Sequence, residues 1–189
     1  MKKILLSAAA IALMTSAAHA DADIKTLFAN AKGHTPSGYV CFARIYDDAH
    51  MKAHPQQYVT KIRLLAAYDD EMKDLRSVSL TLEAMFRNRK AALRLGGGCD
   101  LVAGDEPTQC PIGCDQGQIE VKLRDRDTLI MTLPAHPTLW RPTARDPDAG
   151  VDNAMGSDDR VFRLDSAPLN ACIGLGAAKK DEAVLRSAK

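Results

Sequence analysis

Apolar and polar residues alternate along several stretches of the middle of the chain. The clearest stretch is residues 77–87, whose apolar positions are Val78, Leu80, Leu82, Ala84 and Phe86. The residues between them include Ser79, Thr81, Glu83 and Met85. Because successive side chains of a strand point to opposite faces, this period of two predicts a strand with one buried face and one face in water.

Further strands are predicted from alternation or from runs of β-branched and aromatic residues. They cover residues 38–46, 58–68, 91–95, 117–124, 129–133 and 160–164. In the segment 58–68 we expect Tyr58, Thr60, Ile62 and Leu64 to share one face. The polar residues 125–128 predict a hairpin turn, and the run Gly96–Gly98 predicts a flexible turn rather than a phosphate-binding loop.

Helical periodicity is confined to the two ends of residues 21–189, at residues 21–32 and 179–187. Strands follow strands without long helices between them, which argues against an alternating parallel βαβ architecture. The expected fold class is mainly β: an antiparallel meander forming a small barrel or sandwich, with short N- and C-terminal helices. Residues 21–189 are predicted to form a single domain that contains disulfides.

The first twenty residues have the three parts of a secretory signal peptide. Lys2 and Lys3 precede an apolar segment of about eleven residues, and Ala18 and Ala20 place small side chains at the cleavage site. The apolar segment is too short to span a bilayer, which takes about 20 residues, and no integral membrane segment is expected in the mature chain. We therefore expect a periplasmic or secreted protein.

The balance of charged residues bears on which classes of partner are expected. The chain has 25 basic and 24 acidic residues, and removal of Lys2 and Lys3 with the leader leaves it near neutrality. This balance gives no electrostatic reason to expect nucleic acid or anionic lipid as a partner.

All five cysteines follow the predicted leader, so disulfides are expected in an oxidising compartment. Cys41 and Cys172 lie in or near the first and last predicted strands, and a bridge between them would close a loop of about 130 residues. Cys99, Cys110 and Cys114 are clustered, and the pairs Cys99–Cys110 and Cys99–Cys114 are both open. An odd number leaves at least one thiol outside any intramolecular bridge.

Two groups of residues suggest metal ligands. His50 and His54 are four residues apart, so in a helix both imidazoles would lie on one face and could reach a zinc ion. The loop between the sixth and seventh predicted strands contains Asp146, Asp148 and Asp152, which offer the oxygen ligands that calcium prefers. The spacing matches neither a zinc-protease motif nor an EF-hand, and loop solubility explains these residues equally well. No cofactor is expected otherwise.

No nucleophile, phosphate-binding or redox motif is recognisable. We therefore expect a non-enzymatic binding or accessory protein, whose small-molecule or protein ligand is held by the loops 47–58 and 134–160. Tyr58, Trp140 and Arg141 are the candidate contact residues, because an aromatic side chain at the end of a strand can line a pocket. The alternatives are an inhibitor of a secreted hydrolase that presents the segment 99–114, and a metal-binding protein or metal-dependent enzyme that uses His50 and His54.

Overall fold

The computed structural model describes most of the chain after residue 37. The described residues are 38–68, 77–100, 107–113, 116–125, 127–142, 150–152 and 154–188. The predicted leader 1–20 and the predicted helix 21–32 lie outside them. Within the described residues, no helix is long and apolar enough to cross a membrane.

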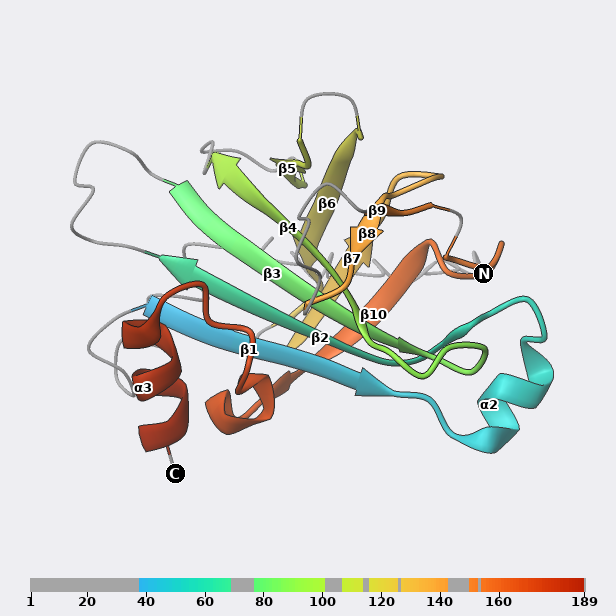
Figure 1. The fold of residues 1–189 in the computed structure, drawn as a ribbon, viewed down its shortest axis with the longest axis horizontal. Coiled ribbons are helices and arrows are strands. Elements are labelled where there is room, and N and C mark those ends of the chain that lie inside the picture. Colours follow the sequence, from blue (N-terminus) through green and yellow to red (C-terminus); the bar gives the residue numbers. More distant parts are fainter. Residues whose placement is uncertain are drawn as a thin grey trace, which may run out of the picture.

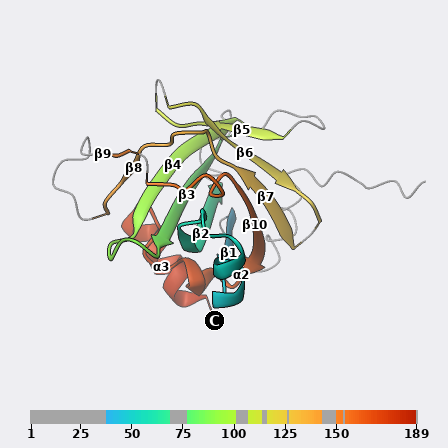
Figure 2. The ribbon, with the colours of Figure 1, turned by 90° about the vertical axis from the view of Figure 1, so that its right-hand side faces the viewer.

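Ten antiparallel strands form one strongly curled sheet, a half-barrel, so the predicted mainly-β fold is confirmed (Figures 1 and 2). The strands are β1 (Gly38–Ile45), β2 (Val59–Tyr68), β3 (Ser77–Phe86), β4 (Leu93–Asp100), β5 (Thr108–Pro111), β6 (Gln118–Leu123), β7 (Thr128–Thr132), β8 (Leu139–Trp140), β9 (Gly150–Val151) and β10 (Val161–Ala167). Helix α2 (Asp48–Ala53) connects β1 to β2, and the turn η1 (Leu169–Cys172) and helix α3 (Lys179–Ser187) follow β10. The predicted C-terminal helix is confirmed.

Strand order follows a meander with one long return. Neighbours run β5-β6-β7-β10-β1-β2-β3-β4-β8-β9, so the last long strand pairs with the first. The short strands β8 and β9 extend the sheet beyond β4, to which β8 is joined by the pair Arg94 and Trp140. The first strand, β1, and the last strand, β10, are therefore neighbours in the middle of the sheet.

The curl brings β5 back to β4, and a disulfide joins them. Cys99 of β4 is bonded to Cys110 of β5, which decides between the two pairings left open by the sequence, while Cys114 lies outside the described residues. At Gly97 a Cβ atom would lie 2.5 Å from the carbonyl oxygen of Pro111, so this backbone approach requires glycine. No ladder of backbone hydrogen bonds joins β4 to β5 within the described strands.

Large apolar side chains fill the concave side of the sheet. The most completely buried include Phe42, Ile62, Leu64, Leu82, Leu93, Leu95, Ile119, Met131, Leu139, Phe162 and Leu164. They come from nearly every strand and form one continuous core. Packing of this kind occupies the interior of small barrels with the protein's own side chains.

The C-terminal segment covers part of the convex side. Tyr39, Cys41 and Leu65 on that face pack against residues of η1 and α3 in a second, smaller apolar cluster. A disulfide joins Cys41 to Cys172, and the hydroxyl of Tyr39 donates to Asp181 at 2.6 Å. Both disulfides are compatible with an oxidising compartment.

Two details of the strands differ from the sequence predictions. Gly96–Gly98 continue β4 instead of forming a turn, because absent side chains let β5 approach Gly97 and Trp140 lie over Gly96. In β2 the register shifts between Val59 and Lys61, so Val59 rather than Tyr58 or Thr60 shares the buried face with Ile62. Such a bulge inserts one residue and reverses the alternation on one side of it.

Candidate functional site

Four polar or aromatic residues form one row across the convex face. The register pairs Arg63 of β2 with Glu83 of β3, Glu83 with Arg94 of β4, and Arg94 with Trp140 of β8. Their strand neighbours Leu64, Leu82 and Leu95 point into the core, so the row faces outward. Strand register alone therefore assembles a carboxylate, two guanidiniums and an indole.

The carboxylate of Glu83 is held between the two arginines. Arg63 donates to one of its oxygens, and Arg94 donates through Nε to the other at 2.9 Å. Burial by itself would raise the pKa of Glu83, but the hydrogen bonds and charges of Arg63 and Arg94 outweigh burial and lower the pKa below its ordinary value. Glu83 is therefore ionised at neutral pH and fixes both guanidiniums.

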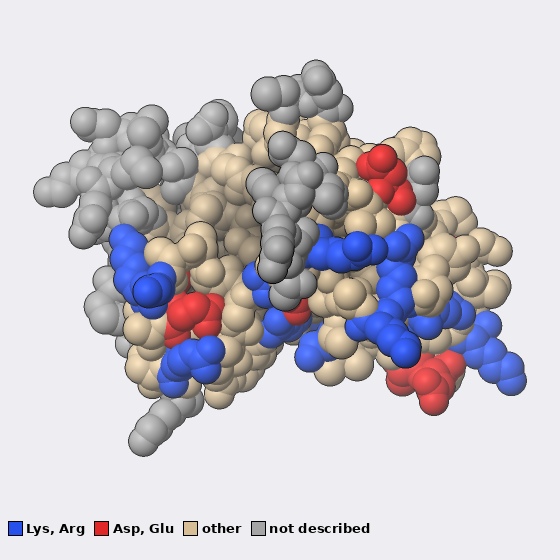
Figure 3. Space-filling view, viewed as in Figure 1, with Lys and Arg blue, Asp and Glu red and all other residues tan. Residues whose placement is uncertain are grey.

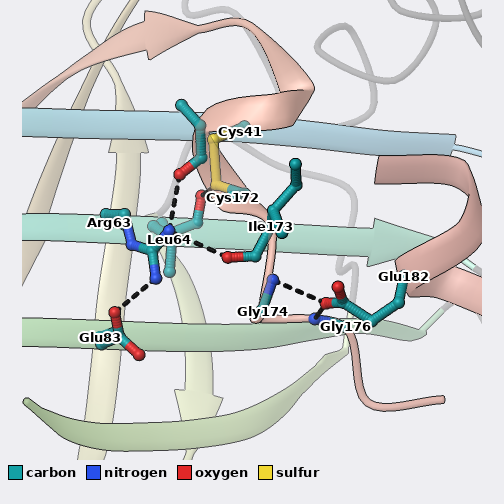
Figure 4. Close-up of a disulfide and its surroundings, with 10 residues drawn as sticks. Cys41, Arg63, Leu64, Glu83, Cys172, Ile173, Gly174, Gly176 and Glu182 are labelled. Atoms are coloured by element: carbon teal, nitrogen blue, oxygen red, sulfur yellow. Dashed lines mark hydrogen bonds and ion pairs between the residues drawn. A yellow bond between two sulfur atoms is a disulfide. The ribbon is translucent and has the colours of Figure 1, made fainter. Parts of the chain in front are cut away.

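Arg63 also fastens the C-terminal segment to the sheet (Figure 4). Its Nη1 donates to the backbone carbonyls of Ala171 at 2.8 Å and Ile173 at 3.1 Å, on either side of the disulfide-bonded Cys172. Glu182 of α3 accepts from the backbone N–H groups of Gly174 at 2.8 Å and Gly176 at 2.9 Å, which stabilises the turn between η1 and α3. Arg63 is therefore a structural residue that anchors the C-terminal segment, whereas Arg94 is the arginine paired with Trp140.

Trp140 lies against the outside of the sheet. A Cβ atom at Gly96 would be 3.5 Å from the indole ring, so the glycine makes room for the ring on β4. The indole is half-buried and packs on the edge of the main core, and the neighbouring Arg141 is exposed. Of the candidate contact residues, Trp140 therefore lies on the convex face and the exposed Arg141 follows it directly in the chain, while Tyr58 belongs to a different region.

Tyr58 lies where the two candidate loops meet. The carboxylate of the fully buried Asp159 accepts from the backbone N–H groups of Tyr58 at 2.8 Å, Val59 at 3.2 Å and Gly156 at 2.8 Å. Burial raises the pKa of Asp159, and these backbone donors oppose the rise. The contact joins the loops 47–58 and 134–160. Because these backbone N–H groups are already bonded to Asp159, the contact is structural.

The two histidines of α2 are stacked. The ring centroids of Tyr46 and His50 are 4.6 Å apart, and those of His50 and His54 are 4.4 Å apart. The amide nitrogen of buried Gln57 donates to the carbonyl of Val59, so its oxygen accepts from Nε2 of His50 at 2.9 Å. Since lone pairs lie in the ring planes, face-to-face imidazoles do not converge on one ion, and a shared metal would require the exposed His54 to turn.

Of the remaining predicted metal ligands, only Asp152 lies within the described residues. Asp152 accepts from the hydroxyl of Thr138 at 2.9 Å, and Asp146 and Asp148 lie outside the described residues. Among the residues that the structure describes, no three His, Cys, Asp or Glu side chains form a group suited to a metal ion. The predicted zinc and calcium sites stay predictions.

Sequence reasoning missed Arg63, Glu83 and Arg94. Glu83 was assigned to a wet strand face, yet it is buried because the two arginines and the C-terminal segment cover it. A signal was present, because charged residues lie at outward positions of three successive predicted strands: Lys61 and Arg63, then Glu83, then Arg94. Only the register, however, aligns them in one row.

No protein-family model, no curated protein and no solved structure matches this chain. Its function is therefore inferred from the arrangement of its own residues.

Proposed function

We propose that this protein is an exported binding protein, which acts by holding a ligand rather than by catalysis, and that the ligand binds on the convex face beside Trp140. The observation that carries the proposal is the pair formed by Trp140 and Arg94, whose guanidinium is fixed by Glu83. The concave side is filled by the protein's own side chains, which favours a site on the outside.

This pair favours a ligand with two chemical features. The half-buried indole offers an apolar, planar surface for stacking, and indoles are enriched where small molecules and partners bind. Arg94 is oriented by Glu83 before any ligand arrives, which reduces the entropy lost on binding a carboxylate or another acceptor. We infer a ligand that combines a planar apolar group with an acidic group.

Export supports the same proposal. The two disulfides are compatible with an oxidising compartment, and the N-terminal residues have the pattern of a cleaved leader. Mass spectrometry of protein purified from its native source is expected to give a chain that begins at Asp21. A native chain that retains Met1 would contradict export.

Fluorescence can test the binding site directly, because Trp140 is the only tryptophan of the chain. Benzoate serves as a minimal probe with a ring and a carboxylate, and phenol and acetate each lack one of these features. We expect saturable quenching by benzoate, and weaker effects from phenol and acetate. Arg94→Lys is expected to weaken benzoate binding, while Lys122→Gln, on a different strand, leaves it unchanged. Equal responses to all three probes would refute the proposed site.

A further inference from the structure

The hairpin between β3 and β4 carries a concentration of positive charge that the overall composition conceals. Arg87, Arg89 and Lys90 lie within this turn, and Lys61 lies on the convex face of the adjacent β2. Arg87 and Lys90 are exposed, and Arg89 and Lys61 are half-exposed. On the face shown in Figure 3, Lys and Arg are spread widely over the right-hand half, and smaller groups of acidic atoms lie at its upper and lower margins.

Exposed apolar side chains lie directly beside this charge. The register aligns Ile45 of β1, Lys61 of β2 and Met85 of β3 in one row on the convex face. Ile45 is 69% exposed and Met85 is 43% exposed, and they are two of the three large apolar side chains that the described residues leave exposed. We call these residues the tip surface: Ile45, Lys61, Met85, Arg87, Arg89 and Lys90.

Arg87 anchors the base of the tip surface to the connection after α2. One guanidinium nitrogen of Arg87 donates to the backbone carbonyls of Met51 at 3.2 Å, His54 at 2.9 Å and Gln57, which joins the hairpin to the end of α2. Rigid surfaces lose little conformational entropy on binding.

Few acidic groups oppose the positive charge. Glu83 on the same face is already bonded to Arg63 and Arg94. Asp47 and Asp48 are exposed just after Ile45 and offset part of the charge, at the opposite end of α2 from the carbonyls that Arg87 holds. The local balance is therefore positive although the whole chain is near neutral.

We propose that the tip surface docks the protein onto an anionic membrane surface. Basic side chains are attracted to anionic headgroups, and apolar side chains between them enter the boundary of the acyl chains; peripheral membrane proteins combine these two contributions. A soluble polyanion would use the basic residues but would leave Ile45 and Met85 exposed to water. The row of apolar, basic and apolar side chains thus fits a lipid surface better. This proposal is independent of the ligand site at Trp140.

Sedimentation with phosphatidylcholine vesicles, with and without phosphatidylglycerol, tests the proposal. We expect binding only where phosphatidylglycerol is present, weakening as salt is added. Each basic residue near such a surface contributes about 1 kcal/mol, so Arg89→Gln/Lys90→Gln is expected to lower the partition coefficient about thirtyfold. Ile45→Ser/Met85→Ser should lower it as well, and abolish the binding that persists in high salt.

A matched control has the same change of charge elsewhere. Lys122→Gln/Arg124→Gln removes two exposed positive charges from β6 and the turn after it. This variant is expected to bind vesicles within about twofold of the original protein, because its substituted residues lie outside the tip surface. An equal loss in both double variants would overturn the proposal, since it would reveal a general charge effect. Equally tight binding to soluble polyglutamate, or no binding to phosphatidylglycerol vesicles in low salt, would also overturn it.

Discussion

The contribution of the charged row to stability can be tested by comparison with a second group that also consists of one carboxylate between two arginines. Glu83 lies between Arg63 and Arg94, and Asp165 likewise lies between two arginines, Arg44 at 2.6 Å and Arg163 at 3.1 Å. The two groups differ in exposure: 10% for the side chain of Glu83 and 37% for that of Asp165. They therefore separate the effect of burial from that of charge.

Glu83→Gln is expected to destabilise the protein by about 3 kcal/mol, because it leaves two guanidiniums largely shielded from water without a counter-charge. For a chain of this size, such a loss lowers Tm by about 6–12 °C. Asp165→Asn is expected to cost less than about 1 kcal/mol, because water and salt already screen its partners. Urea denaturation followed by circular dichroism at neutral pH gives both free energies of unfolding.

The dependence on pH adds an independent check. The pKa of Glu83 in the folded protein is below the ordinary value of 4.5, so its contribution to stability is complete above that value and disappears as the pH falls through the folded pKa. The difference in stability between the original protein and Glu83→Gln should therefore shrink on acidification below that value. Equal costs for the variants at Glu83 and Asp165, or a difference that grows on acidification, would refute this reasoning.

Three further predictions concern the closure of the fold. Gly97→Ala should destabilise the protein by about 1–3 kcal/mol, because its Cβ would lie 2.5 Å from the carbonyl oxygen of Pro111. Gly98→Ala, whose Cβ would have no atom within 4 Å, should be neutral or slightly stabilising. Thermal unfolding of both variants tests this, and equal effects would contradict the close approach at Gly97. Replacing both Cys41 and Cys172 by alanine should cost about 4–5 kcal/mol in urea denaturation, since their disulfide closes a loop with a sequence separation of 131, and a loss near zero would show that chain entropy is not its main contribution. Titration of thiols in denaturant without reductant should find one per chain, because two disulfides use four of the five cysteines, and three or more would contradict the observed pairing.

Much of the sheet could be predicted because its strands alternate strictly. Residues 77–87 and 117–124 were assigned from their period of two, and β3 and β6 lie within those limits. The continuation of β4 through Gly96–Gly98 could not be predicted in this way, since glycine has no side chain to show periodicity. Its role depends on β5 and Trp140, which approach only after folding.

The candidate site was less accessible from the sequence than the fold. Trp140 and Arg141 were selected for their side-chain chemistry, but their neighbour Arg94 follows from pairing between β4 and β8, which are far apart along the chain. The positive tip surface was hidden by the near-neutral total charge, although Arg87, Arg89 and Lys90 are almost consecutive. Net charge averages over the whole surface, whereas a partner meets only one part of it.

The join between β4 and β5 has a consequence for how the protein behaves before oxidation. Among the described strands, β5 has one edge without a ladder partner, and β4 is paired on its second side only at Arg94, with β8; the bond between Cys99 and Cys110 ties these two strands together. In newly made, still reduced chains the unpaired edge positions would lack this tie and could template pairing with other copies, as unprotected strand edges do. Oxidation would then act as a safeguard against aggregation as well as a source of stability, and a chain retained in a reducing compartment would be prone to edge-to-edge assembly.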